Sequence, residues 1–162
     1  MSIGVMFYKL DDNDNKLKIL LYEKNSILED IGGYINNINI TDDIIYHLLN
    51  KSNFKIDINH IKHNHIIHNK IHEHKILLIK ASTNIEKLTQ QDFGKYEIYG
   101  INTLIKRTIN WIDIDKFKIF FNSNLIHSRI KTYNLLNIFD IILEELQNDK
   151  VMKQIRKCVF NS

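Results

Sequence analysis

The segment IGGYINNINITDDIIYHLLNK, residues 31–51, places two adjacent glycines shortly before a helical pattern. We expect Gly32 and Gly33 to form a turn after a short strand. Thr41 is a suitable helix cap, and the acidic residues that follow it favour the first turn of a helix. The sequence therefore predicts a helix over residues 42–51. Its buried stripe would be formed by Ile44, Ile45, Leu48 and Leu49.

Outward from this segment, runs of branched and aromatic residues predict strands. These runs cover residues 3–10, 17–23, 54–67, 71–81 and 107–112. A short helix is expected over residues 115–121. A longer helical segment is expected from about residue 131, with a break near Asn148, because apolar residues recur there at helical spacing. The order of elements predicts an α/β (α+β) domain with a mixed sheet packed against helices.

Length and composition limit the class of protein. The chain has 162 residues, 44% hydrophobic residues and a net charge of +3, which fits one globular domain rather than a dedicated DNA-binding protein. No apolar run approaches the roughly 18 residues needed to cross a membrane, so no membrane partner is expected. The N-terminus lacks the pattern of a signal peptide, and Cys158 is the one cysteine. We therefore expect an intracellular, reducing location such as the cytoplasm.

The Gly-Gly pair followed by a helix resembles the Nudix hydrolases. Their motif is G-x5-E-x7-R-E-U-x-E-E-x-G-U, where U is an aliphatic residue. Residues 106–117 and 126–130 look like the late strand and helix of Nudix proteins from large DNA viruses. The resemblance implies a single Nudix-like domain over residues 1–162, an α/β/α sandwich with a mixed β-sheet and a C-terminal helical segment from about residue 131.

The resemblance also implies a group of glutamates that binds magnesium and cleaves a diphosphate. With the motif aligned on Gly33, the glutamate positions hold Asn39, Leu48, Lys51 and Ser52. The closing glycine position holds Phe54. A lysine and a leucine cannot replace the hard oxygen ligands that magnesium requires. The expected protein is therefore a Nudix-fold pseudoenzyme without a catalytic residue or a cofactor.

Three functions remain open. The first is a binding protein whose ligand is a nucleotide, a capped RNA end or a protein partner. The second is a diverged pyrophosphohydrolase acting on a nucleoside diphosphate-linked substrate, with magnesium held by residues such as Glu29, Asp30, Glu144 or Glu145. The third is a purely structural interaction module, and Leu48 and Phe54 would then close the cleft. The oligomeric state is open in each case.

If a ligand binds, its phosphates would be met by lysine or arginine and its base by an aromatic ring. The candidate ligand-binding residues are Lys24, Gly32, Gly33, Tyr34, Lys51, Phe93 and Arg107. The aromatic candidates for stacking on a base are Tyr22, Tyr34, Phe93, Tyr96 and Tyr99. Of these, we expect Tyr34 or Phe93 to lie near the mouth of the cleft. No spacing in the sequence predicts a Ser/His/Asp triad.

Histidines cluster around residues 60–74. If His68-Asn69 formed a two-residue hairpin turn, four imidazoles would share one face of the hairpin: His63, His65, His72 and His74. Such a group would suit zinc. We favour the alternative that these residues form a polar outer face and hold no tightly bound metal.

Overall fold

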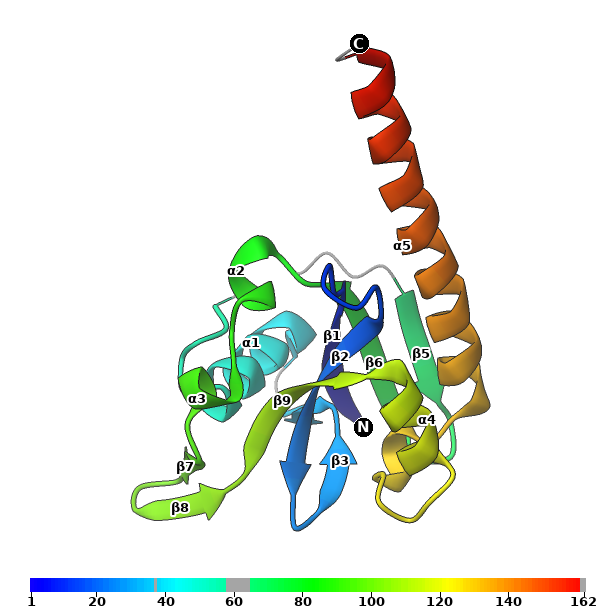
Figure 1. Ribbon diagram of the computed structural model, residues 1–162. Coiled ribbons are helices and arrows are strands. Elements are labelled where there is room, and N and C mark those ends of the chain that lie inside the picture. Colours follow the sequence, from blue (N-terminus) through cyan, green and yellow to red (C-terminus); the bar gives the residue numbers. More distant parts are fainter. Residues whose placement is uncertain (37, 58–64, 161–162) are drawn as a thin grey trace.

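The computed structural model describes residues 1–36, 38–57 and 65–160. A mixed sheet forms its centre, with the path β3-β2-β1-β6-β5 (Figure 1). The bounds of these strands are β1 Ser2–Leu10, β2 Leu17–Lys24, β3 Ile27–Glu29, β5 His65–Asn69 and β6 His74–Lys80. Strand β4, Ile31–Tyr34, pairs with β1, and β9, Thr108–Asp113, pairs with β2. The β1–β6 pair is parallel and the other pairs are antiparallel.

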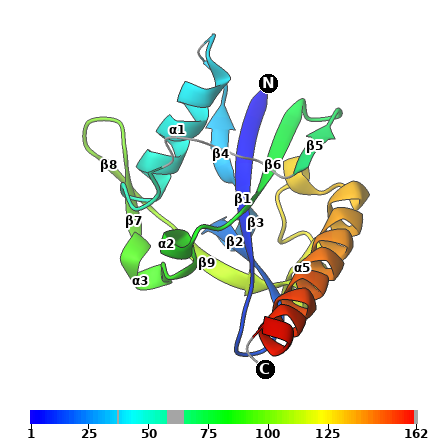
Figure 2. The same ribbon diagram turned by 90° about the horizontal axis from the view of Figure 1, so that it is seen from above.

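Helices cover both faces of this sheet (Figures 1 and 2). One face carries α4, Ile114–Phe121, and the long α5, Tyr133–Phe160. The other carries α1, Ile40–Lys51, with the single-turn helices α2, Thr83–Glu86, and α3, Gln90–Phe93. A separate hairpin of β7, Tyr96–Tyr99, and β8, Thr103–Lys106, extends beside α1. The predicted mixed sheet between helices is confirmed.

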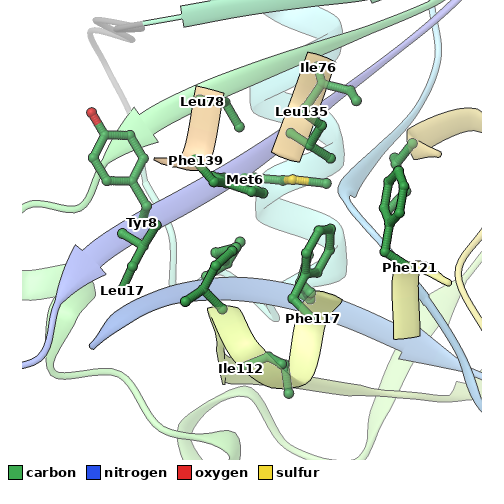
Figure 3. Close-up of a cluster of buried hydrophobic side chains, with 14 of the residues drawn as sticks. Met6, Tyr8, Leu17, Ile76, Leu78, Ile112, Phe117, Phe121, Leu135 and Phe139 are labelled. Carbon is green, nitrogen blue, oxygen red and sulfur yellow. The ribbon is translucent and has the colours of Figure 1, made fainter. Parts of the chain in front are cut away.

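Strand β1 supplies both hydrophobic cores, because its side chains alternate between the two faces. Met6 and Tyr8 point toward α4 and α5, where they join Phe117 and Phe139 (Figure 3). Val5 and Phe7 point to the opposite face and pack with residues of α1 and α3. The branched and aromatic run of β1 is therefore buried on both sides, as expected for a central strand.

Helix α1 begins two residues earlier than predicted. Its N-cap is Asn39 rather than Thr41, and the Asn39 side chain accepts a hydrogen bond from the backbone N–H of Thr41. Of the predicted stripe, Ile44 and Leu48 are buried in the core, whereas Ile45 and Leu49 are half-buried. The helix ends at Lys51, where Asn53 and Phe54 both take the left-handed conformation, with φ of 53° and 62°.

Three other predictions are wrong. Residues 54–57 of the strand expected over residues 54–67 are not in a strand, and residues 58–64 lie outside the described residues. Helix α5 runs from Tyr133 to Phe160 without the break expected near Asn148. The hairpin of β5 and β6 does not turn at His68-Asn69, because Asn69 pairs with His74 and the turn lies between them. Asn69 stabilises that turn by accepting hydrogen bonds from the backbone N–H groups of Ile71 and His72. No helix in the described ranges is long and apolar enough to cross a membrane.

Candidate functional site

A cleft opens on the α1 side of the sheet, beside the β7–β8 hairpin. Its volume is about 630 Å³, within the range of roughly 300–1,000 Å³ that small-molecule sites occupy. Residues from β2, β3, β4, α1, the hairpin and the loop before α5 line it. Five of the predicted ligand-binding residues are among them, namely Lys24, Gly32, Gly33, Tyr34 and Lys51.

The two glycines lie within β4 rather than in a turn, where Gly32 pairs with Gly4 of β1. A Cβ atom at Gly32 would collide with the β1 backbone, and one at Gly33 would collide with the His47 ring. His47 donates a hydrogen bond from Nε2 to the carbonyl oxygen of Tyr34 at 2.9 Å. The glycines therefore let α1 approach the sheet closely and so shape one wall of the cleft.

Lys51 brings a positive charge into the cleft from the last turn of α1. Its Nζ lies 4.5 Å from the centroid of the Tyr22 ring, a cation–π distance. Burial lowers the pKa of the Lys51 amine, while the carboxylates of Glu29 and Glu97 act in the opposite direction. The charge on Lys51 is therefore sensitive to any anion that enters the cleft.

Two carboxylates, Glu29 and Glu97, also line the cleft. Oε1 of Glu97 accepts a hydrogen bond from the Tyr22 hydroxyl at 3.0 Å, and Oε2 lies 3.8 Å from Nε of Arg107. Burial and the neighbouring Glu97 raise the pKa of the Tyr22 phenol, so Tyr22 remains a donor. Glu29 lies 3.3 Å from a guanidinium nitrogen of Arg129. Each carboxylate therefore has a cationic neighbour in the protein itself.

Three exposed tyrosines surround the cleft. Tyr34 follows the glycines, Tyr46 lies on α1 and Tyr99 lies on the β7–β8 hairpin, with relative exposures of 74%, 62% and 68%. Tyr34 and Tyr99 were among the aromatic candidates for stacking, and Tyr46 was not. Tyr46 and His47 precede Asn50 and Lys51 by four residues on α1, so helical spacing could have indicated this group. The position of Tyr99 on the rim could not be predicted, because the hairpin that carries it was not predicted.

The structure contradicts the predicted exposure of Phe93 and Arg107. Both are buried, with relative exposures of 0% and 2%, and neither lines the cleft. The Arg107 guanidinium donates hydrogen bonds to the carbonyl oxygens of Gly94, Lys51 and Phe93 at 2.6, 2.7 and 2.9 Å. Arg107 therefore connects the end of α1 to the β7–β8 hairpin.

Two of the side chains at the motif's glutamate positions, Leu48 and Ser52, support the fold and do not line the cleft. Leu48 packs in the core, and the Ser52 hydroxyl accepts a hydrogen bond from the backbone N–H of Ile56. Phe54 is 71% exposed and does not line the cleft. The prediction that Leu48 and Phe54 close the cleft is therefore wrong. At Phe54 the backbone has the left-handed conformation that glycine adopts most easily.

The potential metal ligands named from the sequence are dispersed. Asp30 is fully buried and does not line the cleft, and Glu144 and Glu145 lie on α5, on the other face of the sheet. Of the four histidines, His63 lies outside the described residues, and His65 faces Leu78 in the register. His72 is in the exposed turn. Within residues 1–36, 38–57 and 65–160, no group of three or more histidine, cysteine or acidic side chains could hold a metal ion.

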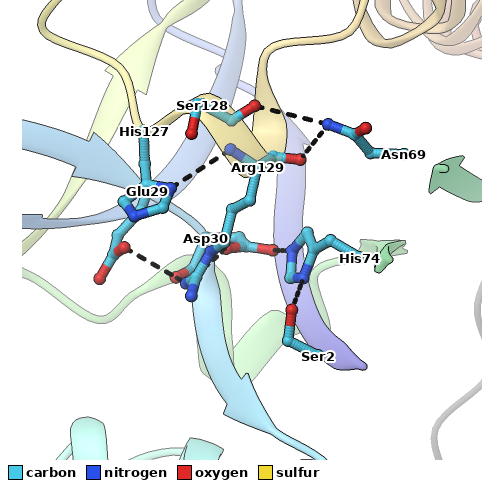
Figure 4. Close-up of polar contacts among 8 residues, drawn as sticks. All are labelled: Ser2, Glu29, Asp30, Asn69, His74, His127, Ser128 and Arg129. Atoms are coloured by element: carbon cyan, nitrogen blue, oxygen red, sulfur yellow. Dashed lines mark hydrogen bonds and ion pairs between the residues drawn. The ribbon is translucent and has the colours of Figure 1, made fainter. Parts of the chain in front are cut away.

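His74 instead joins a buried network that the sequence analysis missed (Figure 4). Its Nδ1 lies 2.7 Å from Oγ of Ser2, and its Nε2 lies 2.6 Å from Oδ2 of Asp30. Nε of Arg129 donates a hydrogen bond to the other carboxylate oxygen of Asp30, Oδ1, at 3.0 Å. Asn69 donates to the Arg129 carbonyl oxygen at 2.9 Å.

The connectivity of Ser2, His74 and Asp30 is that of a Ser/His/Asp triad. Ser2 is only 9% exposed, His74 and Asp30 are 0% exposed, and none of the three lines the cleft. The network therefore connects β1, β6 and the link between β3 and β4 to the loop before α5, in agreement with a structural role.

No family model matches this chain, and no curated protein matches it. A comparison with solved structures finds Nudix domains. The Nudix domain of Shewanella oneidensis NrtR, complexed with ADP-ribose, has a TM-score of 0.48 and 11% identity, with 88% of this chain and 86% of that chain covered. NrtR of the same organism with a 27mer DNA has a TM-score of 0.45 and 12% identity, with 94% and 63% covered.

A MutT/nudix family protein from Enterococcus faecalis has a TM-score of 0.38 and 12% identity, with 69% of this chain and 43% of that chain covered. At these identities and TM-scores, the similarity carries no ligand, activity or residue role to this chain.

Proposed function

We propose that the cleft binds the phosphate groups of a nucleotide-like ligand directly, and that it does so without a metal ion and without cleaving the ligand. The observation that carries the proposal is the ammonium group of Lys51, which lines the cleft at a position where the Nudix motif has a metal-binding glutamate. A lysine can bind phosphate as a point charge and needs no bridging cation.

The surroundings of Lys51 support this choice. Lys24 and Arg129 line the same cleft and add positive charge. The C-terminal end of a helix carries partial negative charge, which would repel a phosphate. The guanidinium of Arg107 donates to the Lys51 carbonyl oxygen and offsets part of that charge.

The rim offers a place for the base. Tyr34, Tyr46 and Tyr99 expose their rings around the opening. Stacking of a base on an aromatic side chain contributes about 1–3 kcal/mol in proteins that use it. A ligand with phosphates near Lys51 and a base at the rim would use both features.

Magnesium fits the described residues poorly. Glu29 and Glu97 are the carboxylates that line the cleft, and each already lies beside a protein cation or donor. Lys51 lies near enough to both to interact with them, and it would repel a divalent ion. We therefore keep the diverged hydrolase as an outcome of the tests below.

Direct titration tests binding. AMP, ADP, ADP-ribose and a cap dinucleotide are titrated calorimetrically at low salt with EDTA present. We expect one of these probes to bind with a Kd below about 1 mM, and binding to weaken as salt screens the charges. Lys51→Glu should abolish binding, and Lys51→Arg should retain it. Lys70→Glu, an exposed charge change outside the cleft, is the matched control.

The outcomes separate the three functions. No binding by any probe would favour a protein-interaction role. Binding that is lost in EDTA, together with magnesium- or manganese-dependent release of phosphate or AMP, would favour the hydrolase. The proposal survives only if binding persists in EDTA, requires Lys51 and leaves the probe intact.

A further inference from the structure

One carboxylate oxygen in the wall of the cleft has no hydrogen-bond partner among the described residues. Glu97 lines the cleft, and its relative exposure is 6%. Its Oε1 accepts a hydrogen bond from the Tyr22 hydroxyl, whereas its Oε2 is buried without a partner. The large majority of buried side-chain polar atoms in proteins are hydrogen-bonded. The orphaned oxygen of Glu97 is therefore a feature that the fold itself does not explain.

The neighbouring guanidinium does not supply that partner. Nε of Arg107 lies 3.8 Å from Oε2 of Glu97, which is too long for a hydrogen bond. This nitrogen is itself buried without a partner. The two other nitrogens of the guanidinium donate to backbone carbonyl oxygens and hold the group in place. Arg107 therefore balances the charge of Glu97 but leaves its capacity to accept hydrogen bonds unused.

A ligand in the cleft could use that capacity. An ionised carboxylate offers about four lone pairs to donors, and the Tyr22 hydroxyl occupies one of those of Glu97. The last torsion of a glutamate side chain is broad, so a small rotation would turn the carboxylate toward a ligand. A carboxylate only accepts hydrogen bonds, and an ionised phosphate has none to donate. The partner of Glu97 must therefore be a donor on another part of the ligand.

Tyr22 sets the distance between this acceptor and the proposed phosphate site. The centroid of its ring lies 4.5 Å from Nζ of Lys51, and its hydroxyl lies 3.0 Å from Oε1 of Glu97. One tyrosine side chain therefore separates the two charged groups. In a nucleotide, the sugar separates the 5′ phosphate from the 2′ and 3′ hydroxyls by a comparable length.

Strand β7 places Glu97 deeper in the cleft than the rim. Side chains two residues apart on a strand lie on one face, about 7 Å from each other, so Glu97 and Tyr99 share a face of β7. Both line the cleft, but Tyr99 is 68% exposed whereas Glu97 is buried. The order Lys51, Glu97, Tyr99 thus matches the order of phosphate, ribose and base in a nucleotide.

We propose that Glu97 binds the ribose hydroxyls of the nucleotide, and that the cleft therefore selects ribonucleotides over deoxyribonucleotides. This inference rests on the proposed function, because it requires the phosphates to lie at Lys51. The 2′ and 3′ hydroxyls are neighbouring donors that one carboxylate can accept together. Acidic side chains bind ribose in this way in dinucleotide-binding folds. An amino group of the base is a less suitable donor, because the exposed tyrosines place the base at the rim.

Calorimetric titration at low salt in EDTA compares ADP with 2′-deoxy-ADP and 3′-deoxy-ADP. We expect the loss of at least one hydroxyl to raise the Kd about tenfold to a hundredfold, because hydrogen bonds to charged groups are stronger than neutral ones. IDP, which lacks the amino group of adenine, should bind like ADP. Equal Kd values for ADP and both deoxy forms, or a loss confined to IDP, would overturn this inference and leave the proposed function standing. Absence of binding by every probe of the nucleotide panel would overturn both.

Variants assign the selection to Glu97. Glu97→Asp keeps the charge beside Arg107 and withdraws the carboxylate by one methylene, and Glu97→Gln removes the charge. Both should reduce the ratio of the Kd of the deoxy form to that of ADP. Glu29→Gln is the matched control, because it makes the same change at a carboxylate of the cleft that pairs with Arg129, and it should keep the ratio.

Urea unfolding shows whether each variant is folded. If Glu97→Gln does not fold, Glu97→Asp and the comparison of probes on the unmodified chain still decide. A ratio that stays unchanged in the folded Glu97 variants, or that falls equally in Glu29→Gln, would overturn the role of Glu97.

Discussion

Arg107 donates a hydrogen bond of 2.7 Å to the backbone carbonyl oxygen of Lys51. This contact joins the end of α1 to the segment between β8 and β9, and it lies directly behind the cleft. The same guanidinium donates to Gly94 and Phe93. One buried side chain therefore fixes the distance between the two walls of the candidate site.

We predict that Arg107→Met destabilises the protein strongly. The substitution removes the donor from three carbonyl oxygens. It also removes the guanidinium that lies beside the buried carboxylate of Glu97. Removing one partner of a buried charge pair costs about 3–5 kcal/mol. The free energy of unfolding in urea measures the loss. Arg156→Met on the exposed part of α5 is the control. A loss below about 1 kcal/mol at Arg107 would contradict the structural role assigned here.

Phe54 shows how the sequence could predict the backbone without predicting the site. The Nudix motif aligned on Gly33 places its closing glycine at residue 54, and the backbone there has a φ of 62°. The helix before it, α1, forms because its apolar stripe, its N-cap and its acidic first turn all favour a helix over the same residues. Such local signals were sufficient to predict β1, β2, β9, α1 and α4 within one or two residues.

The cleft was harder to predict, because long-range packing decides which polar side chains remain exposed. Lys24 is the last residue of β2 and Arg107 directly precedes β9, yet only Lys24 lines the cleft. The β7–β8 hairpin lies outside the main sheet and exposes Ile98 and Leu104. It therefore lacks the alternation that marks a half-buried strand. The Asp30–His74 contact joins residues 44 positions apart, and no local pattern predicts it.

We predict that Phe54→Gly stabilises the protein by about 0.5–1 kcal/mol. A left-handed conformation costs a residue with a Cβ atom about 1–2 kcal/mol, and the greater freedom of glycine in the unfolded chain offsets part of the gain. Thermal and urea unfolding measure the difference. Phe54→Ala removes the same exposed ring but keeps the strain, so it should show no gain. Equal stabilisation by both variants would mean that the ring, and not the backbone, is responsible.

We predict that Arg129→Met makes the protein more sensitive to acid. Burial raises the pKa of the Asp30 carboxyl, but Arg129 and His74 outweigh this effect and hold the pKa below its ordinary value of 3.8. A carboxyl with a lowered pKa stabilises the fold above its unfolded pKa, and that contribution is lost as the pH falls through the lowered value. Without Arg129 the loss should begin at higher pH.

Urea midpoints between pH 3 and pH 7 measure this shift. At pH 7 the variant should also lose about 3–5 kcal/mol, because Asp30 becomes a buried charge with one partner fewer. Arg156→Met controls for the change in net charge. A parallel pH profile in the Arg129 variant and the unmodified chain would show that Asp30 does not depend on Arg129.

We predict that ligand binding in the cleft weakens as the pH rises toward the ordinary pKa of lysine, and that Lys51 causes this dependence. Burial lowers the pKa of the Lys51 amine below its ordinary value of 10.5, so the amine loses its proton earlier than an exposed lysine. A bound phosphate favours the charged form and should raise that pKa again. Binding at alkaline pH must therefore take up a proton, and the affinity must fall as protons become scarce.

Titration calorimetry in buffers of different ionisation enthalpy measures the proton uptake, with the tightest-binding probe of the nucleotide panel. Lys51→Arg should keep the affinity and abolish the uptake, because a guanidinium stays charged throughout this range. Lys24→Arg is the matched control, and it should leave the uptake unchanged. Uptake that persists in Lys51→Arg would assign the proton to another group and remove Lys51 from the phosphate site.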